Sequence, residues 1–141
     1  MEVKIKKLRE DAVIPTYAKP GDAGMDLVAV SYEMQGANHV YGTGLALEIP
    51  KGYVGLIYPR SSNRKTNAYL PNHVGIIDSG YRGEIMVTYK NRDGSMTSKP
   101  YEVGDKLAQI IIMPYPTVEF IEVDKLTETE RGEGGHGSTG N

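Results

Sequence analysis

The chain has no cysteine, no tryptophan and a single phenylalanine among its 141 residues. The lack of cysteine excludes disulfide bonds and thiolate metal sites, and it suits a reducing compartment. Long apolar runs are also missing, since no stretch approaches the roughly 18 residues that a membrane-spanning helix needs. The charged segment 1–7 is not followed by an apolar run, so we expect no signal peptide. These absences favour a soluble, cytoplasmic protein without a membrane partner.

An excess of positive charge is lacking too. The formal net charge is −2 and the isoelectric point is about 5.9, whereas a general nucleic-acid binder would show a basic excess. We therefore expect no nucleic-acid partner, although a local basic pocket remains compatible with this balance. The length of the chain suits one domain with one hydrophobic core.

Glycine and proline are plentiful, and they divide the chain into short apolar segments. Alternating or β-branched segments bounded by turn residues predict strands. We expect such strands over residues 3–6, 27–30, 45–49, 53–58, 84–89, 107–113 and 118–123. The pair Asp93-Gly94 is typical of a hairpin turn, and only Ser61–Tyr69 suggests a short helix. The regular spacing predicts an all-β barrel or sandwich.

The last eleven residues, 131–141, contain five glycines together with Arg131, His136, Ser138 and Thr139. A glycine-rich run contributes little to a core, but it offers accessible backbone N–H groups, hydroxyls and a guanidinium to an anionic ligand. Chain ends are more often simply disordered. We interpret the segment as a lid that orders over a ligand, with residues 1–123 as the catalytic domain and 124–141 as linker and lid.

Four other segments carry polar groups at strand ends. They place Asp26 at the entrance of a strand and Asp78 just past one, they set Arg60 next to two serines, and they insert Gln109 into an otherwise apolar strand. Each has an ordinary structural explanation: a carboxylate in a turn caps backbone groups, an arginine at a strand end is usually solvated, and a buried amide satisfies a neighbour. The segments become informative only in combination and in order.

In that order the chain resembles the trimeric deoxyuridine triphosphate nucleotidohydrolases (dUTPases), which carry five short motifs. Here the motifs read Ala-Gly-Met-Asp-Leu (23–27), Pro-Arg-Ser-Ser (59–62), Gly-Ile-Ile-Asp-Ser-Gly-Tyr-Arg-Gly (75–83), Gly-Asp-Lys-Leu-Ala-Gln (104–109) and Arg-Gly-Glu-Gly-Gly-His-Gly-Ser-Thr-Gly (131–140). The resemblance implies a jelly-roll-like, distorted β-barrel of antiparallel strands with a flexible glycine-rich C-terminal lid. It also implies a homotrimer whose three active sites are each shared among three chains.

The resemblance implies hydrolysis of dUTP to dUMP and pyrophosphate by attack of water at the α-phosphorus. Asp78 matches the position that orients and deprotonates the water. The implied cofactor is Mg²⁺, held mainly by phosphate oxygens and waters, as that ion prefers. Asp26 matches a position that contacts the ion through water.

The binding residues follow from the same matches. The implied base and sugar site comprises Asn72, Gly75, Ile77, Tyr81, Met86 and His136. The implied phosphate site comprises Arg60, Ser61, Ser62, Gln109, Arg131, Gly137, Ser138 and Thr139. In this arrangement the hairpin carrying Asn72 pairs with the uracil edge, and the ring of Tyr81 packs beneath the sugar and excludes a 2′-hydroxyl.

Two alternatives remain at this stage. A dCTP deaminase shares the fold and the trimer, but it needs an acid/base carboxylate, usually glutamate, beside the pyrimidine, and the matching place here lacks one. A non-catalytic trimer that binds a nucleotide or regulates a partner is the alternative from another class. The presence of Asp26, Asp78 and a complete tail argues against that loss of activity.

One departure from the family pattern generates a prediction. A phenylalanine commonly stacks on the uracil from the tail, and this chain has His136 there. Because histidine side chains change charge between about pH 5 and 8, we expect the KM for dUTP to depend on pH over this range. The dependence should flatten in the His136→Phe variant. Superimposable pH profiles of the two proteins, measured between pH 5.5 and 8, would contradict the idea.

Overall fold

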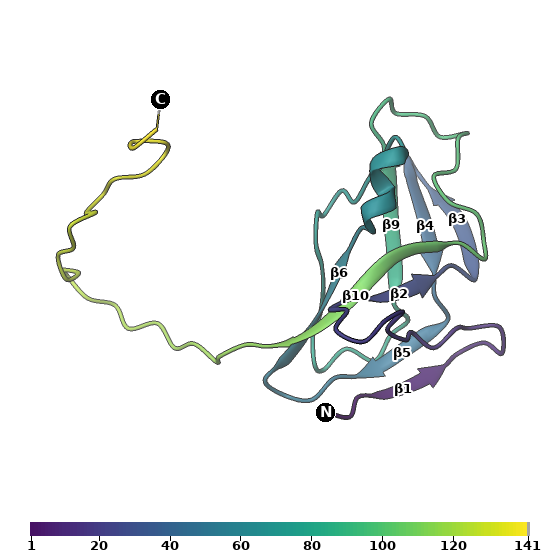
Figure 1. The fold of residues 1–141 in the computed structure, drawn as a ribbon, viewed down its shortest axis with the longest axis horizontal. Helices are drawn as coiled ribbons and strands as arrows, with labels where there is room; N and C mark the ends of the chain where they lie inside the picture. The colour runs from purple at the N-terminus through teal and green to yellow at the C-terminus, as the bar shows by residue number, and fades with distance from the viewer. Residues whose placement is uncertain (141) are drawn as a thin grey trace.

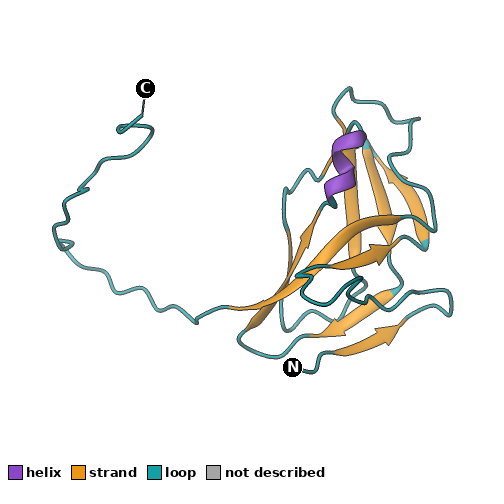
Figure 2. Cartoon of the chain, in the orientation of Figure 1, coloured by secondary structure: helices purple, strands orange, loops and turns teal. Residues whose placement is uncertain are grey.

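A computed structural model describes residues 1–140 (Figures 1 and 2). Its strands are β1 (Lys4–Lys7), β2 (Met25–Val28), β3 (Ser31–Gln35), β4 (Asn38–Gly42), β5 (Leu45–Glu48), β6 (Tyr53–Tyr58), β7 (Ala68–Tyr69), β8 (Gly75–Ile77), β9 (Met86–Asn91) and β10 (Lys106–Pro114). One 3-10 helix, η1, spans Ser61–Lys65. Within the described part of the chain, no helix is long and apolar enough to cross a membrane.

All strand pairs are antiparallel, which confirms the all-β prediction. One sheet has the order β2-β10-β6-β8, another has the order β3-β4-β9-β7, and β1 pairs with β5. The order within both four-stranded sheets departs from the order along the chain, as expected for a jelly roll rather than a simple meander. Between these three groups the described strands form no continuous ladder that would close a barrel.

The hydrophobic core lies where the inward faces of these sheets meet. Fully buried side chains come from both four-stranded sheets and from β5, including Leu27, Tyr41, Leu45, Tyr89, Leu107 and Ile110. The two buried tyrosines keep their hydroxyls satisfied, because Tyr41 donates to the carbonyl of Tyr101 at 2.6 Å and Tyr89 donates to that of Leu107 at 2.7 Å. Burial raises the pKa of Tyr41 to about 12. Both hydroxyls therefore act as neutral donors: that of Tyr89 joins β9 to β10, and that of Tyr41 joins β4 to the loop before β10.

Most of the predicted strands are confirmed to within a few residues, and the helix is confined to Ser61–Lys65. The β3–β4 hairpin was not predicted. Its turn places Gly36 at φ 59°, and its pairing aligns Gln35 with Asn38. The hairpin was missed because polar residues interrupt its apolar pattern: Glu33 and Gln35 are exposed on β3, and His39 is buried on β4.

Two local predictions were wrong. The Asp93-Gly94 pair forms a turn, with the N–H of Gly94 donating to Asn91 at 3.0 Å, but the segment that follows is a loop and not a returning strand. β9 pairs instead with β4 and β7, two strands that precede it in the chain. The predicted strand over 118–123 is not a strand either, because it extends past β10 without a neighbour to pair with.

This C-terminal segment leaves the body of the molecule after β10 (Figure 1). Its apolar side chains lie in solvent: Phe120 is 95% exposed, Leu126 81% and Ile121 79%. So much exposed apolar surface on one segment of a single chain is unusual for a monomer.

Gly44, at the turn between β4 and β5, provides a stability test. It adopts φ +68°, and an added Cβ would lie 2.9 Å from the Cβ of Ala12, whereas Gly94 has φ +74° and nothing within 4 Å of an added Cβ. We expect Gly94→Ala to lower the free energy of unfolding by about 1–2 kcal/mol through backbone strain. Gly44→Ala should lose about 1–3 kcal/mol more through overpacking. Chemical denaturation at one protein concentration measures both, and equal losses would contradict the packing argument.

Candidate active site

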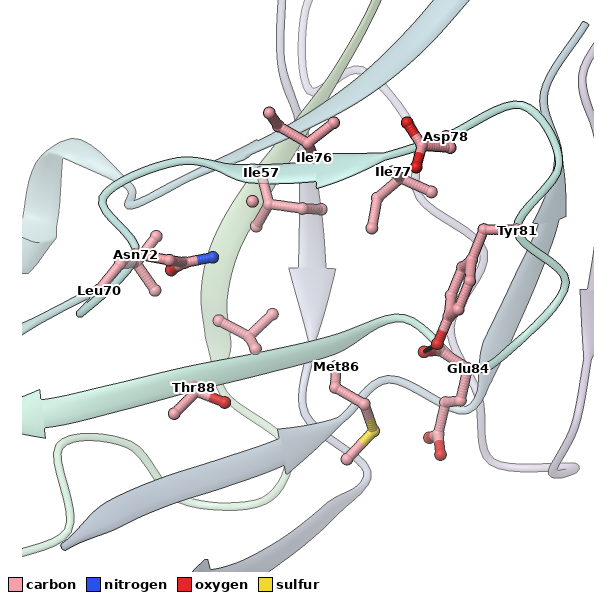
Figure 3. Close-up of a pocket in the computed structure, with 12 residues that line it drawn as sticks. Ile57, Leu70, Asn72, Ile76, Ile77, Asp78, Tyr81, Glu84, Met86 and Thr88 are labelled. Atoms are coloured by element: carbon pink, nitrogen blue, oxygen red, sulfur yellow. Dashed lines mark hydrogen bonds between the residues drawn. The ribbon is translucent and has the colours of Figure 1, made fainter.

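A cavity of about 280 Å³ opens between β8 and β9. Figure 3 shows Ile76, Ile77 and Asp78 along one side and Met86 and Thr88 along the other, with Asn72 and Tyr81 toward opposite ends. All the residues of the implied base and sugar site except His136 line this cavity, and so does Asp78. Apart from Ile57 of β6, the lining residues come from the single stretch 70–88.

The local sequence explains how the cavity is formed. β8 pairs with β6, and Gly75 faces Ile57 so closely that an added Cβ would lie 2.9 Å from the Cβ of that isoleucine. Glycine thus permits the close approach of the two strands. Before β8 the chain turns tightly, with the N–H of Val74 donating to Asn72 at 2.7 Å and His73 at φ 62°. This turn brings Asn72 to the cavity.

Tyr81 is held across the turn that follows β8. Its backbone N–H donates to the carbonyl of Asp78 at 3.0 Å, and its hydroxyl donates to the carbonyl of Glu84 at 3.0 Å. The ring folds back over Gly83, where any Cβ would overlap the phenol. Gly83 is therefore required for this orientation of Tyr81, which leaves the ring 44% exposed at the cavity.

Two carboxylates line the cavity, and their surroundings differ. Glu84 is half-buried, and its Oε1 accepts the backbone N–H of Gly44 at 2.8 Å. Asp78 is exposed, and none of residues 1–140 donates a hydrogen bond to its side chain. Asp78 is thus the acid with both carboxylate oxygens open to a hydrogen bond from a water molecule or a ligand.

A second cluster gathers charged groups from β2, β10 and the end of β6. Arg60 Nε donates to Asp26 Oδ1 at 2.8 Å, and Lys106 Nζ lies 3.3 Å from Asp26 Oδ2. Arg60 Nη1 also donates to Ser62 Oγ at 3.3 Å. Two cations surround one carboxylate, so the cluster keeps a net positive charge that suits a phosphate.

Gln109 belongs to the same cluster. It stands opposite Asp26 of β2 and Tyr58 of β6 in the strand register, and its Nε2 donates to the carbonyl of Pro59 at 2.9 Å. Gly24 leaves room for it, since an added Cβ there would overlap the Gln109 amide. The amide therefore props the segment that carries Arg60.

The remaining predicted residues lie neither at the cavity nor in the Arg60 cluster. Ser61 is exposed at the start of η1. The tail that carries Arg131, His136, Gly137, Ser138 and Thr139 lies away from the body (Figure 1). Within it, Arg131 Nε donates to the carbonyl of Gly134 at 2.8 Å, and His136 and Gly137 adopt φ values of 53° and 78°.

Sequence reasoning missed several residues that the structure brings to these places. Lys106 joins the charged cluster, and the cavity is also lined by Ile57, Leu70, Ile76, Glu84, Val87 and Thr88. Lys106 lies inside the fourth motif, so its position three residues before Gln109 was the available signal. The apolar lining residues gave no such signal, because the sequence does not distinguish an apolar residue that lines a cavity from one that packs in the core.

The described residues hold no group of three or more histidine, cysteine or acidic side chains that would bind a metal ion directly. The Asp26 carboxylate is already paired with Arg60 and Lys106. This chemistry fits a divalent ion that a ligand's own oxygens hold, with Asp26 contacting it through water.

Comparison with known proteins gives one consistent result. The dUTPase family model matches residues 10–140. The chain is 42% identical over 143 residues to the deoxyuridine 5′-triphosphate nucleotidohydrolase of Nocardia farcinica, covering 98% of this chain and 85% of the relative. It is 44% identical over 133 residues to that of Leifsonia xyli, covering 90% of this chain and 85% of the relative.

Solved structures agree. A mutant dUTPase of Staphylococcus bacteriophage 80alpha, with dUpNHpp, matches with a TM-score of 0.84 at 27% identity, covering 99% of both chains. A mutant dUTPase of the S. aureus phage phi11, whose structure reveals coordination of a structural Mg(II) ion, matches with a TM-score of 0.74 at 28% identity. It covers 89% of this chain and 98% of the phage chain.

Proposed function

Because this chain belongs to the dUTPase family, we propose that the cavity between β8 and β9 and the Arg60 cluster supply the two halves of a site for dUTP. The activity is hydrolysis of dUTP to dUMP and pyrophosphate. The observation that carries the assignment is the convergence of Asn72, Asp78 and Tyr81 on one cavity. The charged residues that line that cavity are the two acids Asp78 and Glu84, so the phosphates need a second, cationic surface.

The base lies between Asn72 and β8 in this proposal. The Asn72 amide and the backbone groups of Gly75 and Ile77 are available to pair with the edge of uracil. Cytosine presents an amino group where uracil presents an oxygen, and the mismatch would leave buried polar groups unpaired. In the proposed pose, the tight turn at Asn72 leaves no room for the additional methyl group of thymine.

The sugar packs on Tyr81. The phenol is fixed at one end of the cavity by its hydrogen bond to Glu84 and by the turn from Asp78. A ring held in this way leaves no space for a 2′-hydroxyl. The discrimination between dUTP and UTP therefore depends on the position of one side chain.

The phosphates are bound by the cationic cluster and by the tail. Arg60 presents a fork of N–H donors that matches phosphate oxygens, with Ser61, Ser62 and Gln109 beside it. Arg131, Ser138 and Thr139 close on the terminal phosphate, and glycines such as Gly137 let backbone N–H groups approach it. Lys106 adds a positive charge next to Asp26.

Asp78 orients the attacking water. Its carboxylate accepts one hydrogen from the water, whose oxygen forms the new bond to the α-phosphorus as the bond to the departing pyrophosphate oxygen breaks. Because an aspartate is a weak base, most of its effect is positioning. The chain has no cysteine, and neither Ser61 nor Ser62 has a histidine among its hydrogen-bond partners in the described residues, so a covalent intermediate is not required.

The family uses a divalent metal, and we propose Mg²⁺. Bound to the triphosphate, it would neutralise charge on the leaving pyrophosphate. The residue available to hold it is Asp26, through water. Arg60 and Lys106 fix the orientation of that carboxylate from both sides.

A homotrimer with shared sites accounts for the position of the tail. In one chain the tail lies away from the cavity and the Arg60 cluster, and its apolar residues are exposed (Figure 1). We propose that one subunit provides Asp78 and Tyr81, a neighbour provides Arg60, Ser61 and Gln109, and the third lends the tail. Residues 124–141 then act as linker and lid. The nucleotide substrate and the lack of cysteine both suit a cytoplasmic location.

The chemistry is tested with the Asp78→Asn variant. The natural chain with Mg²⁺ should convert dUTP to dUMP and pyrophosphate and leave dCTP, dTTP and UTP essentially unchanged. Asp78→Asn should lower kcat by about 10²- to 10⁴-fold, whereas Asp124→Asn, in the exposed linker, should not. Ion-exchange chromatography resolves the products. A deaminated product from dCTP would move the chain to the sister activity, and no turnover of any nucleotide would leave a binding or regulatory protein.

Sharing of the site is tested by mixing two inactive chains. Asp78→Asn lacks the base, and a chain ending at residue 130 lacks the lid, so neither should turn over dUTP at the natural rate. When the two are co-expressed in equal amounts and form trimers at random, about a quarter of the sites combine an intact Asp78 with an intact tail from another chain. The activity of the mixture should therefore recover to about a quarter of that of the natural protein. Mixed oligomers without recovered activity would show that each tail serves its own subunit.

A further inference from the structure

The wall of the cavity that carries Tyr81 is tied to the β4–β5 turn. The carbonyl of Ile85 accepts two hydrogen bonds from Thr43, one from the backbone N–H at 3.2 Å and one from the side-chain hydroxyl at 2.8 Å. The N–H of Ile85 donates to Leu45 at 2.8 Å, and Gly44 donates to the Glu84 carboxylate at 2.8 Å. Of the residues in these bonds, Glu84 is the one that also contacts Tyr81, and it uses its side chain to bind the turn.

Glu84 therefore connects two parts of the molecule. Its carboxylate binds the turn at Gly44. Its backbone carbonyl accepts the hydroxyl of Tyr81, which lies beside it in Figure 3. Gly42 makes space for the carboxylate, because an added Cβ there would lie 2.6 Å from Glu84 Oε1. Arg9 lies close enough for its guanidinium to be stabilised by the charge of Glu84, although its main partner is Asp11.

We propose that Glu84 is a positioning residue for sugar discrimination: its anchored carboxylate fixes the carbonyl that holds Tyr81 over the cavity. The inference rests on the proposed function, in which Tyr81 excludes the 2′-hydroxyl. Tyr81 is 44% exposed, so packing alone holds its ring weakly. Its hydroxyl makes one hydrogen bond within residues 1–140, and the acceptor belongs to Glu84.

A role for Glu84 as the base fits the contacts less well. One of its oxygens is engaged by a backbone N–H, and its position is set by the strand β9 that it precedes. Asp78 is more exposed and accepts no hydrogen bond from the described residues. The two acids of the cavity thus have separate tasks: Asp78 acts on water, and Glu84 acts through Tyr81.

The test compares two substitutions of similar size. Glu84→Gln retains an oxygen that accepts the N–H of Gly44, whereas Glu84→Met does not. We expect Glu84→Met to lower the ratio of kcat/KM for dUTP to that for UTP by about two- to ten-fold, the range for loss of one hydrogen bond. Most of the change should arise from improved use of UTP. Glu84→Gln should restore the ratio to within two-fold of the natural chain.

Thr43→Val is the matched control. It removes the hydroxyl bond to Ile85 from the same turn without touching Glu84, so it should lower stability and leave the ratio within two-fold of the natural value. Tyr81→Phe removes the bond to the Glu84 carbonyl and should lower the ratio, and adding Glu84→Met to it should lower the ratio little further. This non-additivity is the signature of one shared interaction.

Several outcomes would overturn the proposal. They are an unchanged ratio in folded Glu84→Met, an equal loss in Glu84→Gln, or an equal loss in Thr43→Val. If Glu84→Met does not fold, as judged by circular dichroism, full discrimination in Tyr81→Phe would overturn it as well. Failure of the natural chain to hydrolyse dUTP would instead contradict the proposed function, so the two failures are distinguishable.

Discussion

The antiparallel pairing of β10 with both β2 and β6 is the constraint on which the rest of the structure depends. One register places Gln109 between Asp26 and Tyr58, and the chain leaving β6 then delivers Arg60 to the Asp26 carboxylate. A shift of β10 by one residue would turn Gln109 into the opposite face. The same strand contributes Leu107 and Ile110 to the core, so the charged cluster and the hydrophobic core are fixed together.

The cavity and the cluster differ in charge: the cavity is lined by two acids, and the cluster carries an excess of positive charge. The cavity is a narrow space between strands, where selectivity comes from shape and from a few polar groups at its ends. The cluster carries two cations around one carboxylate and attracts a highly charged anion. In the proposed site the cavity takes the uncharged part of the nucleotide, and the triphosphate meets a cluster in which Asp26 and Ser62 already hold Arg60 in place.

Much of this arrangement follows from the sequence, for identifiable reasons. Strands such as β6 and β10 were predicted because their apolar runs end at prolines or glycines, whereas the site residues were assigned through the resemblance of five short motifs to those of the dUTPases. The β3–β4 hairpin is local, but polar residues interrupt its apolar pattern. The position of Glu84 depends on a contact between distant segments, the bond from Gly44, which no local pattern encodes. The segment 118–123 alternates like a strand, but pairing also requires a neighbour, which one chain does not supply.

The length of the connection between β10 and the glycine-rich tail determines how strongly the tail is captured at a site. Residues 115–130 contain no helix or strand, and a coil of that length spans about 20–25 Å on average. In the proposed shared site the tail is a tethered ligand, present at an effective concentration of the order of millimolar. Its closure is governed by the statistics of a short polymer, so lengthening the tether would weaken capture gradually, whereas shortening it below the required span would abolish capture abruptly.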